Sequence, residues 1–139
     1  MRPSRGVPTV PGLSSGPLVN AEAEMALLGA ILANNRAYDR VCDFLRVEHF
    51  ADAGHQEIYG ALRIMLARDE MATPITLKGY FDARGALAEI GGTAYLAKLA
   101  AATPSSGNAE NYGRLILDLY LRRALVEEAR AISKKWRIR

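Results

Sequence analysis

From residue 20 onward, apolar side chains recur every three or four positions, which is the spacing of one face of an α-helix. Met25, Leu28 and Leu32 follow this spacing in the first segment. Asn20, which precedes it, belongs to a residue type favoured at helix N-caps, and the pair Asn34-Asn35 is expected to end the helix. The pattern therefore predicts a first helix between Asn20 and Asn34.

Shorter segments with the same spacing follow before residue 103. The sequence predicts a short helix carrying Tyr38, Val41, Cys42 and Leu45, a longer one over residues 54–68, one over 77–83 and one that Thr93 caps. Thr76 is the expected N-cap of the helix over 77–83, and Gly85 is its expected C-terminal glycine. Residues 73–75 are expected to be extended, because the residue before a proline avoids helical conformation.

The last helix is expected to run from Ala109 to about Lys135, which corresponds to about 40 Å at 1.5 Å per residue. At about 100° per residue its apolar side chains fall on two nearly opposite faces. One face is expected to pack on the chain's own core, and the other would then need a second layer to cover it. The first face holds Tyr112, Leu115, Ile116, Leu119 and Val126, and the second holds Leu117, Leu121, Leu125 and Ile132.

These elements divide the 139 residues into three parts. Residues 1–19, which hold four of the six prolines, are expected to be a disordered leader. Residues 20–107 are expected to be a globular helical domain, and residues 108–139 a long C-terminal helix. No segment alternates with period two for long enough to indicate a strand. The expected fold is all-α, a compact multi-helical domain of about six helices.

The net charge of +3 is unevenly distributed. Residues 1–19 carry +2, residues 20–113 carry −4 and residues 114–139 carry +5. An acidic body is poorly suited to bind phosphates. The basic end allows two interpretations, a nucleic-acid contact or a helix whose last turn complements the helix dipole.

The residue types of an active site or metal centre do not converge in this sequence. Cys42 is the only cysteine, which excludes an internal disulfide, and its spacing from His49 and His55 is not that of a structural zinc site. We interpret Cys42 as a small inward-facing hydrophobe and His55 as a core or capping residue. No phosphate-binding glycine loop is present. The absence of a long apolar run and of a secretory signal favours a cytoplasmic protein.

Short motifs follow one another in a distinctive order over about residues 18–133. They include Leu27-Leu28-Gly29-Ala30-Ile31-Leu32, Glu48-His49-Phe50, His55-Gln56-Glu57-Ile58-Tyr59, Ile90-Gly91-Gly92-Thr93-Ala94-Tyr95-Leu96, Asn108-Ala109-Glu110-Asn111-Tyr112 and Leu121-Arg122-Arg123-Ala124-Leu125. This ordered set resembles the N-terminal domain of bacterial replicative DNA helicases of the DnaB type. One departure is Ile75-Thr76, where the family often has an aspartate before the Thr-Leu pair.

This resemblance implies a non-catalytic collar domain that supports ring assembly, as dimers and as a trimer of dimers, and that docks the C-terminal domain of primase. A helicase loader is a further candidate partner, and no membrane is involved. The parent protein would be an ATP-dependent DNA helicase whose motor domain holds ATP and magnesium and makes the main DNA contacts. No cofactor is expected in this chain, and no catalytic residue.

The resemblance also assigns a role to the long helix over 108–139, as the first arm of a helical hairpin that pairs subunits. We therefore expect the second face of this helix to be an association surface, with Arg122 and Arg123 at its edges supplying polar or primase contacts. One alternative is that this face folds back on the short helix around Leu96 and Leu99. An alternative function is a small helical nucleic-acid-binding module that uses the basic C-terminal helix. The residues expected to bind partners are Leu117, Leu121, Arg122, Arg123, Leu125 and Ile132.

Overall fold

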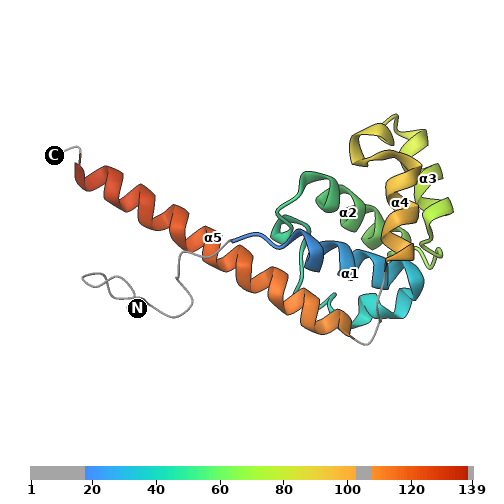
Figure 1. The fold of residues 1–139 in the computed structure, drawn as a ribbon, viewed down its shortest axis with the longest axis horizontal. Helices are drawn as coiled ribbons and strands as arrows, with labels where there is room; N and C mark the ends of the chain where they lie inside the picture. The colour runs from blue at the N-terminus through green and yellow to red at the C-terminus, as the bar shows by residue number, and fades with distance from the viewer. Residues whose placement is uncertain (1–17, 103–107, 138–139) are drawn as a thin grey trace, which may run out of the picture.

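The structure, a computed structural model, describes residues 18–102 and 108–137, so most of the expected leader lies outside the described residues. Within those ranges all regular structure is helical, which confirms the all-α expectation. Figure 1 shows a body of packed helices from which half of the last helix projects. The elements are α1 (Ala21–Ala33), η1 (Asn35–Arg40), η2 (Val47–His49), α2 (Ala53–Ala67), α3 (Pro74–Ala83), η3 (Ala88–Ile90), α4 (Gly92–Ala101) and α5 (Ala109–Arg137), where η marks a 3₁₀ segment.

Helix α1 lies at the centre of the body and contacts α2, α4 and α5. Asn20 caps it as expected, since its side-chain oxygen accepts a hydrogen bond from the Ala23 N–H at 3.0 Å. Leu27, Leu28 and Ile31 are fully buried, because neighbouring helices cover α1 on more than one side. The helix is therefore the core element on which the other helices pack.

A buried polar chain joins α1, α2 and α4. The carboxylate of Glu24 accepts hydrogen bonds from the Ala51 N–H and from Nδ1 of His55, both at 2.7 Å. Nε2 of His55 lies 2.5 Å from the Tyr95 hydroxyl. His55 is buried, as expected for a core histidine, and burial together with Asp52 and Glu24 raises the pKa of Tyr95. These hydrogen bonds satisfy polar groups that would otherwise be costly to bury.

Two helix starts differ from the expectation. Helix α3 begins at Pro74 because Thr73 is its N-cap: the Thr73 hydroxyl accepts from the Thr76 N–H at 3.1 Å, and the Thr73 N–H donates to the Thr76 hydroxyl at 2.8 Å. Only Thr73 is extended, since the rule against helix applies to the residue before proline, whereas proline itself suits the first helical turn. Helix α4 begins at Gly92, and its N-cap Gly91 takes the left-handed φ of 106°, so Thr93 is not the cap.

The expected second helix is the 3₁₀ segment η1, followed by a turn. Cys42 lies outside η1, in the turn over residues 41–44 that follows it. Val41 and Leu45 are buried as expected, but Cys42 is exposed, and its interpretation as an inward-facing hydrophobe is wrong. Partial burial and the nearby Asp43 and Asp39 raise the pKa of its thiol.

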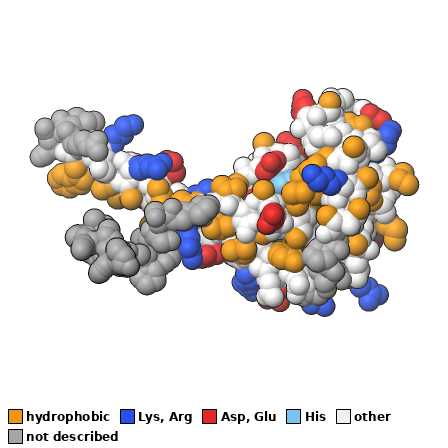
Figure 2. All heavy atoms as spheres, viewed as in Figure 1, with side chains coloured by type: hydrophobic (Ala, Val, Ile, Leu, Met, Phe, Trp, Pro, Cys, Tyr) orange, Lys and Arg blue, Asp and Glu red, His pale blue; other side chains and the backbone are white. Residues whose placement is uncertain are grey.

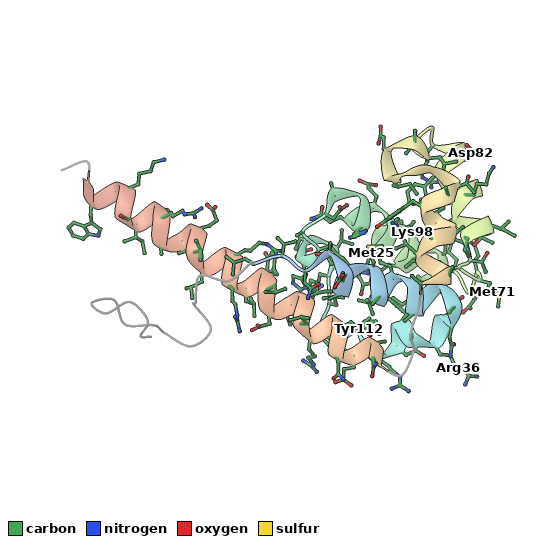
Figure 3. The ribbon with its side chains drawn as sticks, viewed as in Figure 1. Met25, Arg36, Met71, Asp82, Lys98 and Tyr112 are labelled. Carbon is green, nitrogen blue, oxygen red and sulfur yellow. The ribbon has the colours of Figure 1, made fainter. Side chains whose placement is uncertain are left out.

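Helix α5 is part of the body along its first half only. Ala109, Ile116 and Leu119 are buried there, while Leu115, expected on the same face, is 37% exposed. Gly113 allows close packing, since a Cβ at this position would lie 2.6 Å from Cγ1 of Val41. Tyr112 marks this half in Figure 3, beside the body. The second half of the helix extends beyond the body as a free arm (Figure 1).

Candidate interaction surface on the C-terminal helix

Large apolar side chains lie exposed on one side of α5. Leu121, Leu125 and Ile132 are 55%, 51% and 50% exposed, and we call them the α5 stripe. At about 100° per residue they fall within about 40° of one another around the helix axis. Figure 2 shows hydrophobic side chains among charged ones along the projecting part of α5. An apolar row of this kind on a projecting helix is suited to pack against another helix.

The expected association face is smaller than the sequence indicated. Leu117 is half-buried and packs against the core of its own chain, so it does not belong to the exposed row. The reason is its position: it precedes the point at which α5 leaves the body, and neighbouring elements reach it there. The face therefore begins at Leu121.

Arg122 lies at the edge of the α5 stripe, where the sequence placed it. Its guanidinium donates to the Asp118 carboxylate at 2.9 Å, one helical turn earlier. Both side chains are partly exposed, and surface pairs of this kind contribute about 0.3–0.5 kcal/mol to a helix. The Arg122 side chain is thus available for contacts with a partner at low cost.

Arg123 points the other way, which corrects its expected place at the edge of the stripe. At about 100° per residue it lies about 160° from Leu121 around the helix axis, so it faces the body. Its guanidinium donates to the carbonyl oxygen of Leu18 at 2.7 Å and to that of His49 at 3.0 Å. The sequence spacing alone would have shown that Arg122 and Arg123 face different surroundings.

Nothing in the described part of the chain covers the α5 stripe. Leu96 and Leu99, the proposed alternative partners, are buried in α4, which packs on α1 and α3. The exposure of Leu121 and Leu125 shows that, among the described residues, the face does not fold back on α4. Trp136, 69% exposed, lies on the same side by helical spacing and was missed by the sequence analysis, although its distance of 15 positions from Leu121 indicates it.

A notch of about 640 Å³ separates α5 from the body at the point where the helix projects. Tyr120 and Arg123 line it from α5, and Glu48 lines it from η2. The ring of His49 lies 4.6 Å from that of Tyr120. Burial lowers the pKa of His49, and the cations of Arg46 and Arg123 lower it further, while Glu48 opposes them.

No group of three or more metal-ligating side chains is present among residues 18–102 and 108–137. No helix in the same ranges is long and apolar enough to cross a membrane. The α5 stripe is therefore our candidate site on the described surface, since its exposed apolar side chains lie in a row on a projecting helix.

Comparison with known proteins agrees with the fold. The family of the DnaB-like helicase N terminal domain matches residues 16–118. The replicative DNA helicase DnaB of Rickettsia felis is 42% identical over 107 residues, which cover 77% of this chain and 22% of that protein. The DnaB of Geobacillus stearothermophilus is 34% identical over 118 residues, covering 85% of this chain and 26% of that protein.

Solved structures give the same result. The crystal structure of the N-terminal domain of DnaB helicase from Mycobacterium tuberculosis superposes with a TM-score of 0.82 at 32% identity, covering 86% of each chain. A DnaB-like replicative helicase, solved in a study of its interactions with primase, shares the fold with a TM-score of 0.73 at 22% identity, over 86% of this chain and 28% of that one. This chain spans about a quarter or less of the curated relatives named above. The chain belongs to the family of DnaB-like helicase N-terminal domains.

Proposed function

We propose that this chain is the collar domain of a replicative DNA helicase and that it supports ring assembly by pairing two copies through the α5 stripe. The observation that supports the proposal is the exposure of Leu121, Leu125 and Ile132 on an arm that projects from the body. Apolar side chains presented in this way gain free energy when a second copy covers them. In a two-fold arrangement the same face of each copy contacts the other.

The size of the stripe limits the strength of this pairing. Covering the exposed half of one such side chain yields about 1 kcal/mol, so six side chains in a dimer yield at most about 6 kcal/mol. Association costs reduce this gain, so a dimer formed by the stripe alone has a Kd no tighter than tens of micromolar. The relatives are longer, and their additional residues can supply further contacts that strengthen a ring.

Light scattering across protein concentration tests the proposed pairing. We expect the wild-type chain to associate weakly, with dimer forming as the concentration approaches about 1 mM. The double variant Leu121→Glu with Leu125→Glu should stay monomeric and folded. The matched control is Met71→Glu with Ile75→Glu, which places the same charges on side chains that are 70% and 81% exposed. Figure 3 shows Met71 at the end of the body away from the arm.

Docking of the C-terminal domain of primase is the second part of the proposal. It is supported by the family and by the related helicase whose structure was solved in a study of its interactions with primase. Arg122, at the edge of the stripe, is the residue we expect to contribute a polar contact. Calorimetric titration of that primase domain into this chain tests the docking, and Arg122→Gln should weaken it if Arg122 takes part. A helicase loader is a further partner that the same titration can examine.

ATP, magnesium and the main DNA contacts would belong to a motor domain elsewhere in a longer protein, and the site of action would be the replication fork in the cytoplasm. This chain holds no glycine-rich phosphate loop, so we expect no micromolar binding of a fluorescent ATP analogue. The pairing of Arg114, Arg122 and Arg130 with acids on their own helix counts against a nucleic-acid-binding function. A steeply salt-dependent DNA affinity would support that alternative instead.

A further inference from the structure

Arg123 joins three parts of the chain where α5 leaves the body. Its two hydrogen bonds reach Leu18, just before α1, and His49, in η2. Its guanidinium also lies 5.8 Å from the centre of the Tyr120 ring, which itself contacts the ring of His49. We call this group of Leu18, His49, Tyr120 and Arg123 the α5 anchor. It connects segments that lie 105 and 74 positions from Arg123 in the sequence.

Beyond the anchor, α5 has little contact with the body. Leu119 is the last apolar side chain of α5 that is buried, and positions 127–136 are all exposed. The arm from Arg123 to Arg137 is about 20 Å long at 1.5 Å per residue. A change of about 10° in its direction at the anchor would move its far end by about 4 Å, which is enough to separate side chains that pack at contact distance.

We propose that Arg123 is a positioning residue that fixes the direction of the projecting arm and thereby the geometry in which the α5 stripe meets a second copy. The part of this inference that concerns the second copy rests on the pairing proposed above. The part that concerns direction does not, because the anchor lies within one chain.

Arginine suits this role because its planar group carries several donors at fixed angles. It can reach two carbonyl oxygens from separate segments at once, whereas the single ammonium group of a lysine offers less fixed geometry. Arg122 provides the contrast, since it is the adjacent residue of the same type and its partner among the described residues is Asp118 on its own helix. A loss of charge at position 122 should therefore leave the direction of the arm unchanged.

Spin-label distances between the body and the arm test the proposal. Ala97→Cys in α4 and Ser133→Cys in α5 place labels at exposed positions, and Cys42→Ser removes the native thiol. The labelled chain is diluted into an excess of unlabelled chain below the association range, so only distances within one chain are measured. We expect a narrow distance distribution in this background and with Arg122→Gln, a distribution about twice as wide with Arg123→Gln, and an intermediate width with Arg123→Lys.

Unchanged width in folded Arg123→Gln would overturn the proposal, even if that variant were less stable. If Arg123→Gln does not fold, Arg123→Lys decides, and a width equal to that of the parent chain would overturn the proposal. Light scattering on the variants without labels then examines the consequence for pairing. There we expect a several-fold higher dimer Kd for Arg123→Gln and less than a twofold change for Arg130→Gln. The exposed Arg130 side chain pairs with Glu127 on its own helix and lies about 180° from Leu121 around the helix axis. If the wild type itself does not pair, the width measurement still stands and only the proposed function fails.

Discussion

Gly113 is the position where adding one methyl group should have the largest effect on the packing of α5. A Cβ there would lie 2.6 Å from Cγ1 of Val41, closer than Cβ atoms approach other groups in folded proteins, and 3.2 Å from Cζ of Phe44, which is a tight contact. Val41 is fully buried and β-branched, so it has little freedom to move aside. Overpacking of this kind costs about 1–3 kcal/mol.

The same substitution also has a favourable contribution. Alanine stabilises a helix interior by about 0.5–1 kcal/mol relative to glycine. For Gly113→Ala the two contributions leave a net loss of up to about 2.5 kcal/mol in the free energy of unfolding. Gly79→Ala in α3 is the matched control, because a Cβ there meets nothing within 4 Å. This control should gain about 0.5–1 kcal/mol.

Urea unfolding followed by circular dichroism measures both variants. In a Val41→Ala background the methyl group that causes the clash is absent, so Gly113→Ala should lose most of its cost there, and the two substitutions should not be additive. If Gly113→Ala stabilises the wild-type chain as much as Gly79→Ala does, then α5 does not pack on the Val41 turn as described.

Three further predictions concern stability. Burial lowers the pKa of His49, so the unfolded chain binds a proton at this residue more readily than the folded chain. The contribution of neutral His49 to the free energy of unfolding should therefore be complete above about pH 6.5 and be lost as the pH falls through the folded-state pKa. His49→Asn keeps an acceptor near the Arg46 N–H and should flatten this part of the pH profile. Glu24→Ala leaves the Ala51 N–H and His55 without their acceptor and should lower the free energy of unfolding in urea by about 3 kcal/mol. A loss no larger than that of an average surface substitution would show that Glu24 does not accept these buried hydrogen bonds. Thr73→Ala removes the N-cap of α3 and should lower the free energy of unfolding by about 1 kcal/mol in the same measurement. An unchanged free energy of unfolding would instead favour Thr76 as the N-cap.

The long helices could be predicted from the sequence because their apolar positions repeat over several turns. The 3₁₀ segment could not, because a long-range contact supports it: the side chain of Asn35 donates to the Ala72 carbonyl and accepts from the Ala72 N–H, both at 2.9 Å. In the sequence, Glu24 lies in the first turn of its helix, where an acid complements the helix dipole. Its burial beside His55 depends on how α1 and α2 cross, which local sequence does not contain.

The candidate surface was predictable in part. The spacing of Leu121, Leu125 and Ile132 placed them on one side of a helix, and their exposure agrees with that placement. The half-burial of Leu117 depends on where the body ends along α5, which only the packed structure shows. The direction of Arg123 was available from helical spacing, but its carbonyl partners, 105 and 74 positions away, were not.

The proposed function depends on the pairing of two copies of this chain through the α5 stripe. The most direct measurement is the mass of the wild-type chain by light scattering up to about 1 mM, beside the Leu121→Glu, Leu125→Glu variant and its Met71→Glu, Ile75→Glu control. We predict a concentration-dependent dimer for the wild type and the control, and a folded monomer for the stripe variant. A wild-type chain that remains monomeric throughout, or a stripe variant that unfolds, would contradict the proposed pairing.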